Sequence, residues 1–265
     1  MIIDCHVHAF VDNIAERVIP KLSETAKITA NSDGTEKDTR RILTELGIDY
    51  GVMLPIATKP TQQHTINGWA AEINHGNIIS FGTVHPYAQD ALDELERIKA
   101  LGLKGVKLHP DYQNVFLFED KMLPIFVKCA ELGLPVVIHM GYDPASPLTR
   151  HAMPQDLVSI HEKVPDLKLI GAHMGGMYQW EAVYKYLAGM NNLWLDTAYT
   201  AGFLDEKLML DIIRKHGANK ILFASDLPWH KPTAELEMIG RLPLSEKERE
   251  LILWENAADL LRINM

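Results

Sequence analysis

The sequence has little cysteine and no long hydrophobic run. It holds 2 cysteines among 265 residues, Cys5 and Cys129, which is too few for a disulfide framework. No apolar stretch approaches the roughly 18 residues that a membrane span needs. The first residues form an apolar strand rather than a basic segment, an apolar run and a cleavage site, which a signal peptide would require. We therefore expect a soluble, cytoplasmic protein that does not enter a membrane.

Basic residues are in the minority. Lysine and arginine number 26 against 35 aspartates and glutamates, so the formal net charge is −9. This balance argues against sequence-independent binding to nucleic acid or to an anionic membrane. No Gly-x-Gly-x-x-Gly motif and no phosphate-binding loop follows a predicted strand, which disfavours a nucleotide-binding open sheet. The expected partner is a small-molecule substrate.

What the sequence does contain is a regular alternation of short apolar runs and helical stretches. Eight such units imply a parallel sheet with right-handed crossovers, and the length is close to the ~250 residues of one β/α barrel. We expect one domain over residues 1–265, a (β/α)8 TIM barrel, in preference to an open doubly wound sheet. The predicted strands are 1–8, 50–55, 77–84, 104–109, 135–139, 167–173, 193–196 and 221–226. The predicted helices are 38–46, 65–74, 90–101, 120–132, 154–164, 180–188 and 206–216, with a last helix opened by a capping box at 245–248.

Several of these apolar runs end on a histidine or an aspartate. Residues two apart on a strand face the same side, so His6 and His8 project together and Cys5 should face the surrounding helices. His139 ends the fifth run and Asp226 ends the last. The carboxyl ends of barrel strands converge where such folds keep their chemistry. His6, His8, His139 and Asp226 would give an ion three nitrogens and one oxygen, with room for a water or a substrate.

Three more residues lie at or near strand ends, and the sequence allows more than one role for them. His173 could ligate the ion, but a histidine near neutral pKa suits proton transfer, and we favour that role. Lys107 and His109 share one face of the fourth strand. Lys107 could be carboxylated and bridge two ions, bind a substrate carboxylate through its ammonium group, or pair with a buried acid. We expect His109 to line the site rather than to ligate.

The loops that follow the strands should lie on the active face, where they select the substrate. The candidate substrate contacts are Lys107, His109, Arg150, Tyr199 and Trp229. Weaker loop candidates are Tyr142, Asp143, His151 and His230. Four histidines on helices or their ends are expected at the surface: His64, His75, His161 and His216.

The ordered set of motifs resembles the amidohydrolase superfamily, and within it the branch that contains aminocarboxymuconate-semialdehyde decarboxylase and the resorcylate decarboxylases. The matching segments are Asp4-Cys5-His6-Val7-His8, Gly105-Val106-Lys107-Leu108-His109-Pro110, Ile138-His139, Ala172-His173-Met174-Gly175-Gly176, Phe223-Ala224-Ser225-Asp226-Leu227-Pro228 and Asn256-Ala257-Ala258-Asp259-Leu260-Leu261.

The resemblance implies a distorted barrel with one divalent ion, most often Zn²⁺, with Mn²⁺ or Fe²⁺ as alternatives. It implies His6, His8, His139 and Asp226 as ligands and His173 as a nearby catalytic histidine. The carboxylated lysine of the superfamily usually sits on the fourth strand, at Lys107, although this branch generally works without it. Because the family often forms dimers, a homodimer is the expected assembly.

Two enzymatic hypotheses follow. The main one is hydrolysis of a small amide, ester or lactone, in which a metal-activated water attacks, Asp226 takes its proton and His173 stabilises the developing charge. The alternative is non-oxidative decarboxylation of a small aromatic or dienoic acid, with Lys107 or Arg150 as the cation for the carboxylate. A barrel that only binds a metal or metabolite is disfavoured, because all four ligand positions are filled.

Overall fold

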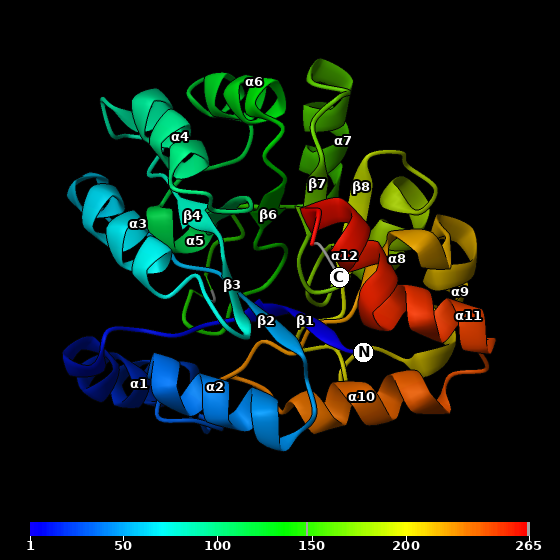
Figure 1. Ribbon diagram of the computed structural model, residues 1–265. Coiled ribbons are helices and arrows are strands. Elements are labelled where there is room, and N and C mark those ends of the chain that lie inside the picture. The colour runs from blue at the N-terminus through cyan, green and yellow to red at the C-terminus, as the bar shows by residue number, and fades with distance from the viewer. Residues whose placement is uncertain (147, 264–265) are drawn as a thin grey trace.

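The computed structural model describes residues 1–146 and 148–263, and a ring of parallel strands forms its centre (Figure 1). Every strand pair within the two hydrogen-bonded sheets is parallel. The predicted third strand is divided at Phe81 into β3 and β4, and the other predicted strands are single. The strands are β1 (Ile3–Val7), β2 (Tyr50–Met53), β3 (Ile78–Ser80), β4 (Gly82–Thr83), β5 (Val106–Leu108), β6 (Val136–Ile138), β7 (Leu169–Gly171), β8 (Leu193–Asp196) and β9 (Ile221–Leu222).

Backbone hydrogen bonds between the last strand and the first close the ring. The Cys5 N–H donates to the Phe223 carbonyl at 2.8 Å, and the Asp226 N–H donates to the His6 carbonyl at 2.8 Å. The two sheets are joined on the other side, where the Lys104 N–H, two residues before β5, donates to the Ser80 carbonyl of β3 at 3.0 Å. The barrel prediction is therefore confirmed, and the open sheet is excluded.

Helices surround the strands in Figure 1, and each predicted helix is present. The sequence did not single out α1, α5 or α10. The apolar signal of α1 is weak, because it buries only Ala15 and Ile19 and contains Pro20. The helices are α1 (Asp12–Ala26), α2 (Glu36–Glu45), α3 (Gln63–Glu72), α4 (Ala91–Ala100), α5 (Pro110–Gln113), α6 (Met122–Leu132), α7 (Pro154–Lys163), α8 (Trp180–Ala182, continued by a π-helical turn, Val183–Leu187), α9 (Glu206–His216), α10 (Pro232–Arg241) and α11 (Glu246–Glu250), which runs through a second π-helical turn (Leu251–Glu255) into α12 (Asn256–Leu261).

A bulge in β1 corrects one prediction. Asp4 pairs with Gly51 and Val7 pairs with Met53, so two residues of β1 lie opposite one residue of β2. The extra residue lets Cys5 and His6 both point into the barrel, instead of alternating. Cys5 consequently packs in the interior cluster and does not face the surrounding helices.

The floor of the barrel is closed by α12. Its residues Ala257, Leu260 and Leu261 pack against inward-facing side chains of the strands and leave a cavity of about 10 Å³. The chemistry is therefore confined to the opposite end, above this apolar plug. In the part of the chain that the structure describes, no helix is long and apolar enough to cross a membrane.

One of the four histidines expected at the surface is buried. His216 is 3% exposed, its Nδ1 accepts the Gly189 N–H at 3.1 Å, and its Nε2 lies 3.0 Å from the Leu193 carbonyl. The prediction of a surface position was wrong because the sequence does not reveal which turn packs on the end of α9. His64 and His75 are exposed as expected, and His161 is half-buried.

Candidate metal centre

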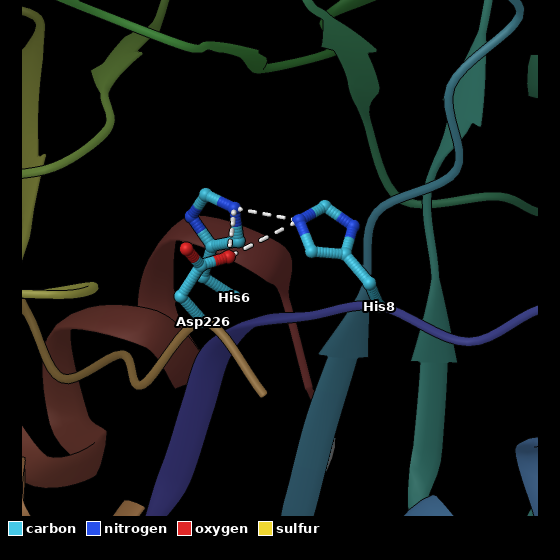
Figure 2. Close-up of side chains that lie close together, drawn as sticks. All are labelled: His6, His8 and Asp226. Atoms are coloured by element: carbon cyan, nitrogen blue, oxygen red, sulfur yellow. Dashed lines mark hydrogen bonds and ion pairs between the residues drawn. The ribbon is translucent and has the colours of Figure 1, made fainter. Parts of the chain in front are cut away.

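His6 of β1 and His8, which directly follows that strand, meet Asp226, which follows the last strand, as Figure 2 shows. The Nε2 atoms of His6 and His8 lie 3.2 Å apart. Asp226 Oδ1 lies 3.2 Å from His8 Nε2 and 3.5 Å from His6 Nε2. All three side chains are buried. Their ligand atoms are close enough to bind one ion together.

The other ring nitrogen of each histidine fixes where its proton lies. His8 Nδ1 is 2.8 Å from the Leu54 carbonyl, which can only accept, so Nδ1 carries the hydrogen. His6 Nδ1 lies 2.9 Å from the Asp196 carboxylate and donates in the same way. With the hydrogen on Nδ1, the Nε2 of each ring presents a lone pair to the point that it shares with Asp226 Oδ1. This backing of ligand histidines by a carbonyl and a carboxylate is what metal sites use, so the residues fit a cation.

His139 joins this set through a relay of hydrogen bonds. His173 Nδ1 lies 3.0 Å from the Ala198 carbonyl and must donate to it, so His173 Nε2 is an acceptor. His139 Nδ1 lies 3.0 Å from that Nε2 and supplies the hydrogen. The remaining nitrogen, His139 Nε2, is a buried lone pair with no hydrogen-bond partner among the described residues. Such an orphaned atom fits the predicted fourth ligand, although it lies outside the compact group of His6, His8 and Asp226.

A second polar group lies beside His139. Asp143 Oδ2 is 3.5 Å from His109 Nε2 and 3.7 Å from His139 Nε2. His109 Nδ1 accepts the Tyr112 N–H at 3.4 Å and caps α5, so its proton lies on Nε2, toward Asp143. His109 thus lines the site as a donor and does not offer a lone pair to an ion. Asp143 was ranked too low from the sequence, where its only signal was a position four residues after His139.

Lys107 is fully buried at the depth of the metal centre. Its Nζ lies 3.3 Å from His6 Nε2, and no carboxylate oxygen of the described residues lies within 4.0 Å of it. Burial lowers the pKa of Lys107 to about 8, although the charges of Asp196, Asp226 and Asp143 oppose this shift. A direct pair with a buried acid, one of the three predicted roles, is therefore not formed.

Burial also controls the protonation of the histidines. It lowers the pKa of His6 and of His139 well below the usual range. Lys107 lowers both further, whereas the charge of Asp143 opposes the shift of His139. Neutral imidazole is the form that binds a metal. Beneath them the buried Asp4 carboxylate accepts the backbone N–H groups of His6 at 3.1 Å and Ser225 at 2.9 Å, which ties β1 to the Asp226 turn.

The predicted substrate contacts lie at different distances from this centre. The N–H of Trp229 donates to the Asp226 carbonyl at 2.7 Å, and Tyr199 donates its N–H to Ser225 at 3.3 Å. Burial, and then the charge of Asp226, raises the pKa of Tyr199. Arg150 is exposed and makes no hydrogen bond or ion pair with the cluster among the described residues. The structure therefore brings Lys107, His109, Tyr199 and Trp229 near the centre, and leaves Arg150 outside.

The fold and the site define a class of protein: a β/α barrel with histidines and an aspartate at the carboxyl ends of its strands. Comparison with known proteins identifies the family. The amidohydrolase family model matches residues 3–263. The chain belongs to this family and is an enzyme of the amidohydrolase superfamily, as the sequence motifs predicted.

The curated relatives include two decarboxylases. Gamma-resorcylate decarboxylase of Polaromonas sp. (strain JS666 / ATCC BAA-500) is 25% identical over 124 residues, 40% of this chain and 37% of that protein. The 2-amino-3-carboxymuconate-6-semialdehyde decarboxylase of Dictyostelium discoideum is 23% identical over 220 residues, 66% of this chain and 58% of that protein. The aligned part is therefore less than two thirds of the length of either relative.

A solved structure supports the fold. A dihydroxybenzoic acid decarboxylase from Polaromonas sp. JS666, with bound manganese and the inhibitor 2-nitroresorcinol, matches with a TM-score of 0.71. The match has 19% identity and covers 100% of this chain and 97% of that one. At this identity, the likeness establishes the barrel and does not assign a substrate.

Proposed function

We propose that this protein is a metal-dependent decarboxylase that removes carbon dioxide from a small aromatic or dienoic acid. The observation that carries the proposal is Lys107, a fully buried cation 3.3 Å from the ligand atom of His6. A buried charge is costly unless it is paired. A substrate carboxylate at the metal centre would supply the partner that the described side chains do not supply within 4.0 Å.

The state of His173 also favours decarboxylation over hydrolysis. Hydrolysis needs a group that stabilises or protonates the developing charge, and the sequence assigned that task to His173. Both nitrogens of His173 are engaged, by Ala198 and by His139. In our proposal His173 holds the His139 ring in place and does not exchange protons with the substrate.

A divalent ion fits the site, and the residues that would hold it are His6, His8, His139 and Asp226. When bound, the ion would act as a Lewis acid that holds the substrate and withdraws electron density from it. Zinc, manganese and iron all suit these ligands. Lys107 binds the carboxylate and orients it. His109 points its Nε2–H toward Asp143 Oδ2, 3.5 Å away, at the side of the centre next to His139.

Asp226 is the proposed proton donor. Its Oδ1 faces the two histidines, so Oδ2 is the oxygen that can carry a proton to the substrate. A C–H bond forms at the carbon that bears the carboxylate, and the C–C bond then breaks. Its electron pair restores the conjugated system, carbon dioxide leaves, and Asp226 regains a proton from water. The positive φ of Asp226, 73°, is a strained conformation of the kind found at functional sites.

The product of the reaction tests the proposal. Metal-loaded protein would be incubated with hydroxybenzoates and dienoic acids, and separately with amides, esters and lactones, while carbon dioxide and released acid are measured. Carbon dioxide from the acids supports a lyase; acid release from the second panel alone supports the hydrolase that the sequence favoured.

Substitution of the two candidate cations sharpens the test. Lys107→Met should lower kcat/KM on the order of 100-fold, because it removes a charged hydrogen-bond donor from the carboxylate. Arg150→Gln should change it much less, since Arg150 is exposed. The reverse ranking would transfer carboxylate binding to the loop.

A further inference from the structure

A row of aromatic rings leads away from the metal centre. Tyr199 stacks on Phe203 with ring centroids 5.1 Å apart and an interplanar angle of 22°. Phe203 meets Tyr178 edge to face at 6.2 Å. Tyr178 in turn contacts Tyr142 at 5.6 Å and Trp180 at 5.5 Å. The rings come from the segments that follow β6, β7 and β8, so the row crosses several loops at the active end of the barrel.

The row begins next to a proposed metal ligand and becomes more exposed outward. Tyr199 donates its backbone N–H to Ser225, the residue before Asp226. Its side chain is half-buried, whereas Phe203 is 42% exposed and Tyr178 is 49% exposed. Large rings left partly exposed in series beside a buried site are a feature of ligand contact surfaces.

A buried carboxylate holds the inner end of the row in place. Glu235 of α10 is 0% exposed and accepts the N–H groups of Thr200 at 2.8 Å and Ala201 at 2.9 Å. Its Oε1 also lies 3.1 Å from His230 Nδ1, and the His230 ring lies 4.8 Å from Tyr199. Two hydrogen bonds thereby fix the loop that carries Tyr199 to Glu235, and the His230 ring lies against the same carboxylate.

Backbone strain is a second observation that supports a preformed contact surface. Tyr178 and Tyr199 both have a φ of 59°, in the left-handed region that residues other than glycine seldom adopt. Each such conformation costs on the order of 1–3 kcal/mol and persists where the surrounding structure enforces it. Tyr199 and Tyr178 are thus held at a cost, and Tyr178 nevertheless leaves half of its surface exposed.

We propose that Tyr199, Phe203 and Tyr178 form an aromatic subsite that binds a second ring, or an extended conjugated arm, of the carboxylic acid substrate. The carboxylate end lies at Lys107 and the metal centre, and the arm extends along the row toward solvent. This inference rests on the proposed decarboxylase function, and it narrows the substrate to an acid longer than one ring.

Binding of two matched probes to the metal-loaded protein tests the subsite. The probes are 2-hydroxybenzoate and 2-hydroxy-4-phenylbenzoate, measured by titration calorimetry. The two-ring probe should bind about tenfold more tightly to the wild type. Phe203→Leu, which keeps apolar volume, and Tyr178→Ala should each reduce that advantage about two- to tenfold, the value of one aromatic contact. Affinity for the one-ring probe should not change.

The control is Tyr184→Ala, which removes a 40% exposed tyrosine from the helical turn Val183–Leu187, outside the row. It should leave both affinities unchanged. An equal advantage for the two-ring probe in the wild type and in the row variants would overturn the inference. So would a change from dimer to monomer in Phe203→Leu, since a second copy would then cover the row.

Carbon dioxide release from both probes is measured in parallel. It distinguishes a failure of the aromatic subsite from a failure of the proposed decarboxylase activity. If the wild type shows no binding advantage for the two-ring probe, or the row variants keep that advantage, while carbon dioxide is still released, the subsite alone is overturned. A binding advantage that depends on the row, without carbon dioxide from either probe, overturns the decarboxylase and supports the subsite for another reaction of a two-ring acid.

Discussion

At the level of single residues, the hydrogen-bond partner of one ring nitrogen decides how each histidine acts at this site. His8, His6 and His173 each have one nitrogen on a carbonyl or a carboxylate, and these contacts decide which lone pairs face the centre. The strand positions of these residues could be predicted, because a two-residue repeat needs only local sequence. Their proton positions could not, because the partners lie far away in the chain; Asp196, for example, is 190 residues from His6.

Replacement of His173 separates a positioning role from proton transfer. In His173→Phe, His139 loses its hydrogen-bond acceptor, so we expect metal affinity to fall about 10- to 100-fold. At saturating metal, the pH profile of kcat should keep its shape. The measurement is metal titration followed by kinetics. Normal metal affinity with the loss of one limb of the pH profile would instead assign His173 the proton-transfer role that the sequence predicted.

His216 predicts a pH dependence of stability. Burial lowers its pKa from an ordinary 6.5 to about 4, so the folded protein holds it neutral while the unfolded chain protonates. Its stabilising contribution is present above pH 6.5 and falls as the pH drops toward 4, by about 3 kcal/mol at most.

Urea unfolding at pH 7 and pH 4.5 measures this effect. Wild type should lose more stability between the two values than His216→Gln, while His75→Gln, at an exposed histidine, should behave as wild type. Parallel losses in all three proteins would rule out His216 as the titrating group.

At the scale of elements, the bulge in β1 and the plug of α12 shape the interior. The sequence predicted the strand and the final helix, whose Ser245 side chain accepts the Glu248 N–H as the capping box required. It did not predict the bulge, because one extra residue in a ladder depends on the partner strand, here Val52 of β2. The bulge sends Cys5 to the floor and leaves His6 at the site.

The plug gives a stability prediction. Leu260→Ala removes a side chain that is 4% exposed, beside an existing cavity of about 10 Å³, and should cost about 2–5 kcal/mol. Leu92→Ala, at a residue of α4 that is 41% exposed, should change the free energy of unfolding by no more than about 0.5 kcal/mol. Thermal or chemical unfolding compares them, and similar costs would mean that α12 contributes little to closing the barrel.

For the whole molecule, metal binding and folding should be coupled. The proposed ligands lie at positions 6, 8, 139 and 226, so the unfolded chain cannot bring them together and the ion binds only the folded state. Free metal at about 1,000 times its Kd adds about 4 kcal/mol, which for a chain of this size raises Tm on the order of 10 °C.

Metal analysis and thermal unfolding test the coupling. We expect about one ion per chain, and a chelator should lower Tm in the wild type but not in His6→Ala or Asp226→Asn. Near two ions per chain would indicate a carboxylated Lys107 that bridges them. An unchanged Tm in the wild type after chelation would argue against a metal held by these residues.

The sequence by itself determined the barrel and the strand-end histidines and aspartate, because both follow from local periodicity and from the convergence of parallel strands. Only the tertiary structure decided which nitrogens face the centre, that Asp143 joins His109, that Lys107 lies against His6, and that Glu235 anchors an aromatic row. Each of these depends on side chains that meet across the barrel from distant parts of the chain. Distances of that kind are set by packing, which no local pattern records.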